Sequence, residues 1–569
     1  MKKFIIVVLM GIFSFPLMAQ KNPKWVEKAK KAVFTVETLD KNGISHKGNG
    51  FFVSETGEAV SDYSLFNGAE KAVVTDADGR VMQVTKILGA DELYDVIRFT
   101  VAVPKKVPFL PLINAMQAAG TEAYLLPPGT GKGELLKKGA ITEVTKVKEI
   151  YGYYKIDMPL TSTLISTPLL TSEGEVFALA QADASGKNST YGISVPYIQN
   201  IRIGSMDVLN KTYSSIGIRK AWAATPEDAQ IALLFYSSQQ DAPTYLETLN
   251  DLIATFPNTS DGYMNRASHY AYHRKELAAS EAEQAKMLEW AQADMNTALK
   301  YSTKQDEVYY GQAKLIYGLV MNDSTIPPKD WNIDSASEKL QKAIAREDLP
   351  AYRQLEGDIA FYLEDYAKAY NAYMLVNESE VASASSFYMA AKAKQQIPGT
   401  SIGDVIALMD SAVNIASPSD ALAYLQDGID LKMQFGQYEA VVKDYDRYYD
   451  MLGGNVTDAF YYYREQAKFR AGDLDEALKD IQLALKADPN NAMYHAEEAS
   501  IYLRLKEPVK AQASAEKALA LEPDFAACHR ILGVCLVRQE KTKEACTAFQ
   551  KAKELGDPVA DKLIKENCQ

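Results

Sequence analysis

The sequence predicts a multidomain protein in which an all-β region is followed by an all-α region of repeated helix pairs. Between residues 33 and 203, short apolar runs alternate with Gly, Pro and Asp, a pattern typical of strands and turns. From about residue 206 onward, the apolar period changes to that of amphipathic helices. Near the C-terminus small residues recur every 34 positions, which is the period of a stacked helix pair.

Size and charge exclude several classes of protein. The chain has 569 residues, enough for about three to four domains. Its composition is 47% hydrophobic and 24% charged, as in ordinary globular proteins. The formal net charge of −13 disfavours general binding to nucleic acid or anionic lipid, because both require clustered Lys and Arg.

Residues 1–19, MKKFIIVVLMGIFSFPLMA, have the layout of a secretory signal peptide. A positive start is followed by an apolar run and by the small residue Ala19, after which we expect cleavage. No later segment reaches the apolar length needed to span a membrane. The mature protein is therefore expected in the periplasm, without an integral membrane span.

The region 20–207 is expected to form an all-β domain. Turn signals at Asp78–Gly79 and Glu173–Gly174 separate its apolar runs. The expected strands are Ala32–Val36, Gly50–Val53, Ala72–Thr75, Val96–Val101, Ala123–Leu126, Ala140–Val144 and Val176–Ala180. Many short strands of this kind indicate a sandwich or a barrel.

The C-terminal region resembles tetratricopeptide repeats. Alanine recurs at an interval of 34 residues, at Ala477, Ala511 and Ala545. Such small residues allow two helices to cross closely, and each unit is a helix–turn–helix. Three regular units are expected at 458–491, 492–525 and 526–559, followed by a capping helix within 458–569. Looser units are expected at 208–457, giving seven or eight helix pairs in all.

The β region resembles trypsin-like serine proteases of the HtrA type. Segment 47–53, KGNGFFV, is similar to the opening strand of that family, and segment 91–97, DELYDVI, is similar to the stretch that carries the catalytic Asp. Segment 168–176 resembles part of the family's G-N-S-G-G-P-L…G-x-V-I-G stretch, which carries the nucleophile, and segment 191–196 resembles its G-I-G-F-A-I-P ending. The resemblance covers roughly residues 33–205 and implies a trypsin-like double barrel before the repeat solenoid.

The catalytic positions of the family are altered in this chain. The resemblance places the general base at Ser64, the acid at Asp95 and the nucleophile at Ile165. Ser166 and Thr167 replace glycines that shape the oxyanion hole. Acyl transfer needs a nucleophile, a base and oxyanion donors together, so we expect a pseudoprotease and Asp95 as a structural remnant.

Two enzymatic alternatives start from other residues. The histidines are His46, His269, His273, His495 and His529. His46 lies in the β region, but it stands well upstream of the expected base. A Ser–Lys arrangement using Ser162 or Ser166 has no supporting spacing. The competing hypothesis remains a serine endopeptidase or protease-chaperone with a non-standard active site.

First-helix positions of the regular repeats are the candidate surface for protein or peptide partners. The residues proposed for binding are Tyr462, Gln466, Arg470, Arg504, Arg530 and Arg538. Arg470, Arg504 and Arg538 recur every 34 residues, and could bind a carboxylate. They could instead complement helix C-termini, and we favour this second interpretation.

The cysteines cluster at the C-terminus, at Cys528, Cys535, Cys546 and Cys568. Secretion permits disulfides, and Cys546–Cys568 or Cys535–Cys546 would connect the last helices. Their connectivity is not fixed by the sequence, and buried free thiols are an equal alternative. No C-x-x-C pair is present, so we expect no metal site and no cofactor.

These features together favour a non-catalytic periplasmic scaffold or adaptor that binds protein partners. The repeats would supply the main binding surface, and the degenerate protease cleft could accept an extended peptide by strand addition. A structural subunit of an envelope complex is a third possibility.

Overall fold

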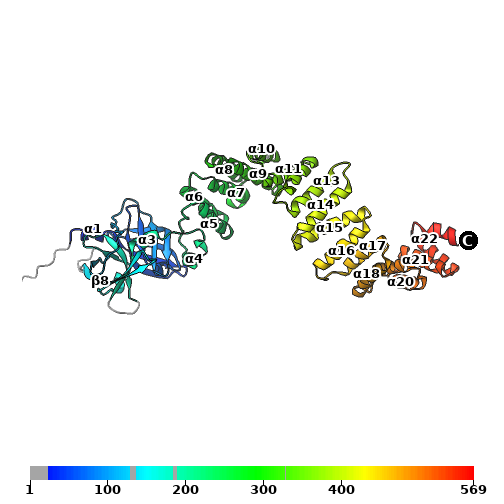
Figure 1. Cartoon of the computed structure of the whole chain (residues 1–569), viewed down its shortest axis with the longest axis horizontal. Coiled ribbons are helices and arrows are strands. Elements are labelled where there is room, and N and C mark those ends of the chain that lie inside the picture. Colours follow the sequence, from blue (N-terminus) through cyan, green and yellow to red (C-terminus); the bar gives the residue numbers. More distant parts are fainter. Residues whose placement is uncertain (1–22, 129–135, 184–188, 327–328, 569) are drawn as a thin grey trace, which may run out of the picture. The chain divides into compact units, whose positions relative to one another are not determined.

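The chain folds into a β domain followed by helices (Figure 1). The computed structural model describes residues 23–128, 136–183, 189–326 and 329–568. The expected signal peptide lies outside these residues. The chain divides into two compact units, Met1–Tyr301 and Ser302–Gln569, so the boundary expected after residue 207 falls inside the first unit.

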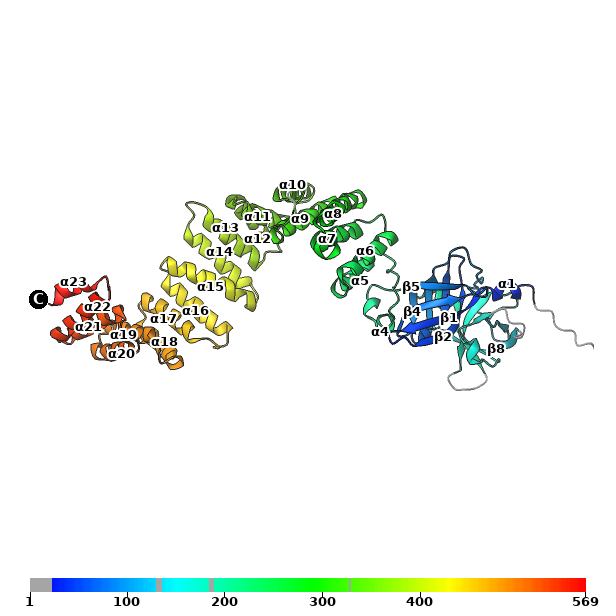
Figure 2. The same cartoon turned by 180° about the vertical axis from the view of Figure 1, so that it is seen from behind.

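The first barrel is closed by antiparallel strands in the order β1-β2-β3-β6-β5-β4, and several of its strands are labelled in Figure 2. The strands are β1 (Val33–Asp40), β2 (Ser45–Phe52), β3 (Glu58–Ser61), β4 (Ala69–Thr75), β5 (Val81–Asp91) and β6 (Val96–Val101). A short helix, α2 (Tyr63–Phe66), connects β3 with β4. Closure removes exposed sheet edges.

The second barrel has the order β10-β11-β12-β9-β8-β7. Its strands are β7 (Glu122–Leu125), β8 (Lys137–Val147), β9 (Tyr151–Ile156), β10 (Pro168–Leu170), β11 (Val176–Ala182) and β12 (Thr190–Ser194). All seven segments predicted as strands overlap a strand of one barrel. Strands β3, β5, β9, β10 and β12 were not predicted separately, because their apolar runs are short or interrupted.

An apolar cluster joins the two barrels. Phe51 and Val60 of the first barrel pack in one buried cluster with Leu170, Val176 and Ile193 of the second. All five side chains are almost fully removed from water. Burial of this area stabilises the pairing of the barrels and fixes the residues at their junction.

The first unit continues from the barrels into helices. These are α5 (Pro226–Gln239), α6 (Ala242–Thr255), α7 (Ser260–Leu277) and α8 (Glu281–Tyr301). The backbone of Ile87 in β5 exchanges hydrogen bonds with Arg219 and Ala221. On α6, Asp251 accepts hydrogen bonds from Lys86 Nζ at 2.9 Å and Trp222 Nε1 at 2.9 Å. These contacts explain why the first helices belong to the same compact unit as the barrels.

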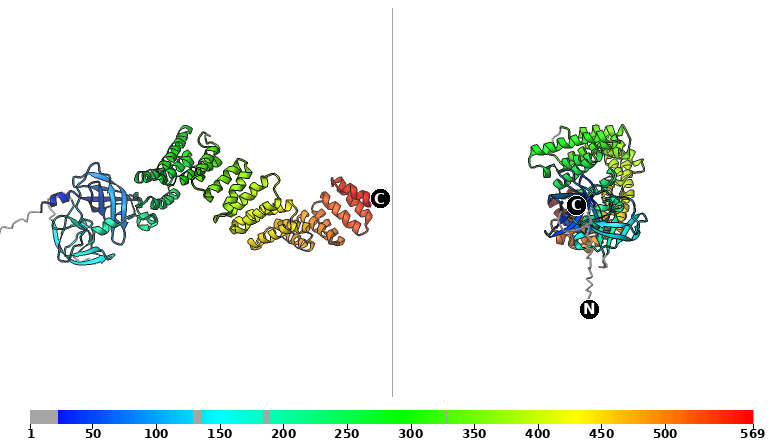
Figure 3. Two further views of the ribbon diagram at one scale, coloured as in Figure 1. Left: turned by 45° about the horizontal axis from the view of Figure 1, so that its top comes forward. Right: turned by 90° about the vertical axis from the view of Figure 1, so that its left-hand side faces the viewer.

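The second unit consists of successive helix pairs, each packed on the next (Figure 3). Its helices are α9 (Gln305–Asn322), α10 (Ile333–Ile344), α11 (Pro350–Tyr362), α12 (Tyr366–Asn377), α13 (Ala384–Gln396), α14 (Ile402–Ile415), α15 (Pro418–Gln434), α16 (Tyr438–Met451), α17 (Asp458–Ala471), α18 (Leu474–Ala487), α19 (Ala492–Arg504), α20 (Pro508–Leu521), α21 (Ala526–Arg538), α22 (Thr542–Glu554) and α23 (Ala560–Asn567). In the described parts of 226–554, α5–α22 make nine successive pairs. The expected number of seven or eight was therefore too low, because the divergent N-terminal pairs lack the 34-residue signature. No helix among the described residues is long and apolar enough to cross a membrane.

Close helix crossings explain the small residues of the repeats. A Cβ atom added at Gly357 in α11 would lie 2.5 Å from the Tyr373 ring of α12, and one added at Gly533 in α21 would lie 2.4 Å from the Phe549 ring of α22. Each glycine thus lets an aromatic ring of the second helix contact the first helix. At Gly428 in α15, the same added atom would meet nothing within 4 Å.

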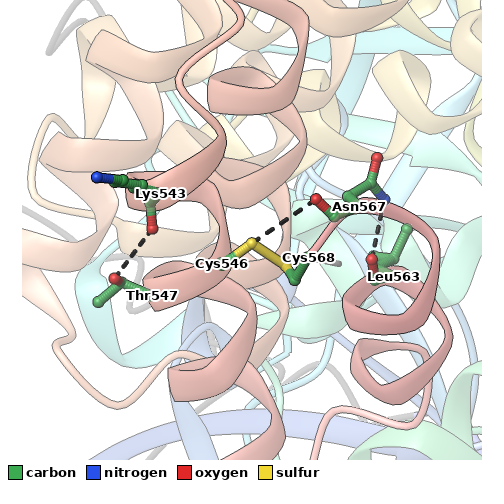
Figure 4. Close-up of a disulfide and its surroundings, with 6 residues drawn as sticks. All are labelled: Lys543, Cys546, Thr547, Leu563, Asn567 and Cys568. Carbon is green, nitrogen blue, oxygen red and sulfur yellow. Dashed lines mark hydrogen bonds between the residues drawn. A yellow bond between two sulfur atoms is a disulfide. The ribbon is translucent and has the colours of Figure 1, made fainter.

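One disulfide closes the C-terminal end of the repeats. Cys546 of α22 is bonded to Cys568, the residue after α23 (Figure 4). Cys528 and Cys535 are buried free thiols on α21. The structure therefore selects Cys546–Cys568 over the alternative Cys535–Cys546 pairing.

Candidate functional site

The candidate site lies where the protease-like motifs of the two barrels meet. Ser64, the residue at the expected base position, sits on α2 directly after β3. Asp95 lies in the turn that precedes β6 and has a φ of 45°. Its carboxylate accepts hydrogen bonds from the Ser64 backbone N–H at 2.6 Å and from Ser64 Oγ at 3.1 Å. Two expected triad positions are therefore neighbours, as the resemblance implies.

A second carboxylate, Asp62, connects this pair to the second barrel. Asp62 accepts a hydrogen bond from Ser64 Oγ at 3.1 Å on one oxygen, and from Ser166 Oγ at 2.5 Å on the other. Ser166 is 1% exposed. No sequence pattern predicts a role for Asp62, because its partners Ser64 and Ser166 lie on different segments of the chain.

The loop at the expected nucleophile position is held by the G-x-G segment of β2. Asn49 is buried, and its amide donates to the carbonyl oxygens of Thr163 at 3.0 Å and Ile165 at 2.8 Å. Ser61 Oγ in turn donates to the Asn49 carbonyl at 2.6 Å. Ile165 presents an aliphatic side chain at this position, and its carbonyl is occupied by Asn49.

The backbone at Ser166 is left-handed, although the protease resemblance places a glycine at this position. Ser166 has a φ of 62°, a left-handed conformation that favours glycine and costs a residue with a side chain about 1–2 kcal/mol. Loss of the family's glycine therefore did not remove the left-handed backbone here. The hydrogen bond to Asp62 holds the serine in this conformation.

Burial controls the ionisation of Asp95. Burial raises the pKa of the Asp95 carboxyl above its ordinary value, and the nearby charge of Asp62 raises it further. The Ser64 N–H hydrogen bond acts in the opposite direction. Within the described residues, the donors to this carboxylate come from α2.

Among the described residues, His46, Ser162 and Ser166 have surroundings unlike those of a catalytic base or nucleophile. His46 is exposed on β2, paired with Thr38 of β1, and its electrostatic neighbour is Asp40. Ser162 is exposed on a short 3-10 helix (Ser162–Leu164). Ser166 directs its hydroxyl proton to the Asp62 carboxylate rather than to an amine.

In the repeats, Tyr462 and Gln466 of α17 lie against α19. The Tyr462 ring packs on Tyr494 with centroids 5.3 Å apart, and Gln466 Nε2 donates to Glu465 at 2.8 Å. Glu465 is fully buried, and its Oε1 has no hydrogen-bond partner in the described residues. Burial and the charge of Glu497 raise the pKa of Glu465 to about 8.

The four candidate arginines have separate environments. Arg470, Arg504 and Arg538 lie in the last turns of α17, α19 and α21, where they complement the helix C-termini. The guanidinium of Arg470 also lies 5.8 Å from the Tyr438 ring, and that of Arg504 lies 5.2 Å from the Phe469 ring. Arg530 instead donates to Asp557 at 2.9 Å.

Comparison with known proteins agrees with the β architecture. Residues 48–179, from β2 into β11, match the family model of a trypsin-like peptidase domain. The N-terminal region is a trypsin-like double barrel, and an all-α region of helical repeats follows it.

Other relatives match parts of the chain. The small glutamine-rich tetratricopeptide repeat-containing protein 2 of Saccharomyces cerevisiae is 30% identical over 97 residues, which cover 17% of this chain and 28% of that protein. The structure of the HtrA-type protease AlgW with tripeptide is 17% identical, with a TM-score of 0.28, over 32% of this chain and 62% of that one. A second AlgW structure with tripeptide gives the same values. The chain spans less than two thirds of the length of each.

Proposed function

We propose that this protein is a non-catalytic periplasmic scaffold that binds partner proteins through its helical repeats. The observation that carries the proposal is the pairing of Asp95 with Ser64. A serine hydroxyl is far too weak a base near neutral pH to accept a proton from a nucleophile, which is the task of the histidine in a triad.

The nearest alternative nucleophile is poorly placed for attack. Ser166 is 1% exposed, and its hydroxyl donates a hydrogen bond to Asp62. The side chain of the neighbouring Ile165 has no nucleophilic atom. The Asn49 amide donates to the Ile165 carbonyl, and the Ser166 hydroxyl donates to the Asp62 carboxylate, so these hydrogen bonds cross between the two barrels. Such a network supports a structural junction better than a cleft that must bind and release a substrate.

Binding by the repeats is supported by their architecture. Stacked helix pairs present an extended surface of first helices, and the second unit alone supplies seven such pairs in its described residues. A periplasmic location rests on the layout of residues 1–19. The Cys546–Cys568 disulfide supports an oxidising compartment.

A fluorophosphonate probe tests the catalytic part of the proposal. We expect no labelling of the full-length protein, while an active trypsin-like protease in the same buffer is labelled stoichiometrically. Labelling that disappears in Ser166→Ala and persists in Ser162→Ala would identify Ser166 as a nucleophile. That result would establish the rival hypothesis of an endopeptidase with a non-standard site.

A photo-crosslinker placed in the repeats tests the scaffold part. We expect it to capture a defined set of partner proteins in cells, whereas a crosslinker on the exposed strand residue Lys71 captures fewer. Recovery of one stable membrane-associated assembly would instead indicate a structural subunit. Equal capture from both positions would contradict binding through the repeats.

A further inference from the structure

A pocket between helices α15 and α17 combines aromatic rings with a carboxylate. Its volume is about 520 Å³, within the usual range of ligand-binding pockets. Helix α16 and the α16–α17 loop complete its walls. The side chains that decide its chemistry are Gln426, Asp430, Tyr445, Tyr448, Phe460 and Tyr463.

The aromatic wall of the pocket is fixed by packing. The Phe460 ring stacks on Tyr448 with centroids 5.8 Å apart, and meets Tyr445 edge-on at 5.5 Å. Tyr445 is 7% exposed, whereas Tyr463 is 56% exposed. Tyr463 belongs to the run 461–463, in which one ring must leave the packing face of the helix. Rings held in this way bind a ligand without a large loss of conformational freedom.

Within the described residues, the carboxylate of the pocket has no cationic partner. Asp430 is exposed on α15, and its hydrogen bond comes from Gln426 Nε2 at 3.3 Å. No lysine or arginine of the described chain forms an ion pair with it. Burial, and after it the nearby charge of Asp430, raise the pKa of Tyr445 to about 12. The negative charge of Asp430 is therefore felt by the Tyr445 phenol, which lines the same pocket.

We propose that this pocket binds a lysine or arginine side chain of a partner protein. The faces of the pocket's tyrosine rings attract a cation, and Asp430 accepts its charge-assisted hydrogen bond. An acidic segment would be repelled by the Asp430 carboxylate and by the chain's net charge of −13. The proposal rests on the proposed function of the repeats, and it specifies the residue type that they recognise.

Saturation-transfer NMR on the full-length protein tests the specificity. The probes are N-acetyl-arginine amide and N-acetyl-lysine amide, with the uncharged N-acetyl-citrulline amide as the matched control. We expect the two cations to bind at least about fivefold more tightly than citrulline. Equal binding of citrulline, or tighter binding of N-acetyl-glutamate amide, would overturn the proposal.

Variants assign the binding to this pocket. Asp430→Asn should weaken both cations about fivefold or more and leave citrulline unchanged, and Tyr463→Ala should weaken all three probes. Tyr463→Phe should retain binding, since it keeps the ring. Glu439→Gln, which removes an exposed charge of α16, and Tyr362→Ala, which removes an exposed ring of α11, are controls that should have no effect. Unchanged binding in Asp430→Asn and Tyr463→Ala would overturn the proposal.

Parallel crosslinking separates this inference from the proposed function. Partners captured equally by the wild type and Asp430→Asn would refute the pocket and leave the scaffold role intact. Cation binding at the pocket without any captured partner would support the pocket and contradict the scaffold role.

Discussion

The hydroxyl of Ser166 in the second barrel donates a hydrogen bond to the carboxylate of Asp62 in the first barrel, and the two residues are 104 positions apart in the sequence. Both residues neighbour positions where the protease resemblance places catalytic groups. The contact joins the two barrels, and variants can measure how much it stabilises their junction.

Ser166→Ala should loosen the junction of the barrels. A buried hydrogen bond to a charged acceptor contributes about 1.5–3 kcal/mol, so amide exchange in residues 162–180 should become about 10- to 150-fold faster. Hydrogen–deuterium exchange with mass spectrometry measures this rate. The control Ser162→Ala changes an exposed side chain and should exchange like the wild type. Equal rates in the two variants would show that the contact is not stabilising.

Three glycines of the repeats should respond differently to Ala. Gly357→Ala and Gly533→Ala place a Cβ atom within 2.5 Å of Tyr373 and Phe549 respectively. The free energy of unfolding should fall by about 1–3 kcal/mol in each. Gly428→Ala meets open space and should be neutral or stabilising by up to about 1 kcal/mol, because Ala is the better helix former. Urea unfolding followed by far-UV circular dichroism measures the difference, and similar effects at all three sites would refute it.

Glu465 should make the regular repeats less stable as the pH rises. Its pKa is about 8 in the folded protein and about 4.3 in an unfolded chain. The folded state therefore holds an extra proton between these values. Its stabilising contribution is complete below about pH 4.3 and is lost as the pH rises to about 8. The slope of this loss is up to about 1.4 kcal/mol per pH unit.

Urea unfolding at pH 5, 6, 7 and 8 checks this dependence. Glu465→Gln should flatten the pH profile and leave the contribution of Glu497, whose pKa is also raised by burial. Glu554→Gln, at an exposed position on α22, should reproduce the wild-type profile. A Glu465→Gln profile parallel to the wild type would contradict the assigned ionisation.

Thiol alkylation should distinguish the four cysteines. Burial raises the pKa of both Cys528 and Cys535 to about 12, so neither should react in the native protein at pH 8. In guanidinium without reductant, iodoacetamide should modify these two alone, and reductant should add Cys546 and Cys568. Peptide mass spectrometry reads the sites, and early labelling of Cys546 would exclude the disulfide.

The disulfide should hold the capping helix α23 against α22. It closes a separation of 22 residues, for which a stabilisation of about 2–4 kcal/mol is typical. Cys568→Ser should therefore accelerate amide exchange in α23 and leave exchange in α17 unchanged. Acceleration in both helices would mean that the bond stabilises the whole repeat stack.

Much of the candidate site was accessible from the sequence. The order of the protease-like segments located Ser64 and Asp95, and these residues are in contact. Tyr463 carried a signal as well, because three consecutive tyrosines cannot all face the core of one helix. Asp62 and Asn49 were missed, since a single Asp after a strand or a single Asn within one has no pattern that reveals its partners.

The sequence alone determined the fold class, because hydrophobic period and repeat spacing are local properties that follow from the geometry of strands and helices. Only the tertiary structure decided the Asp62–Ser166 contact, the Cys546–Cys568 pairing and the pocket around Asp430. Each of these depends on side chains from different elements meeting at atomic distance. These contacts depend on how the barrels and helices pack, which no local sequence pattern encodes.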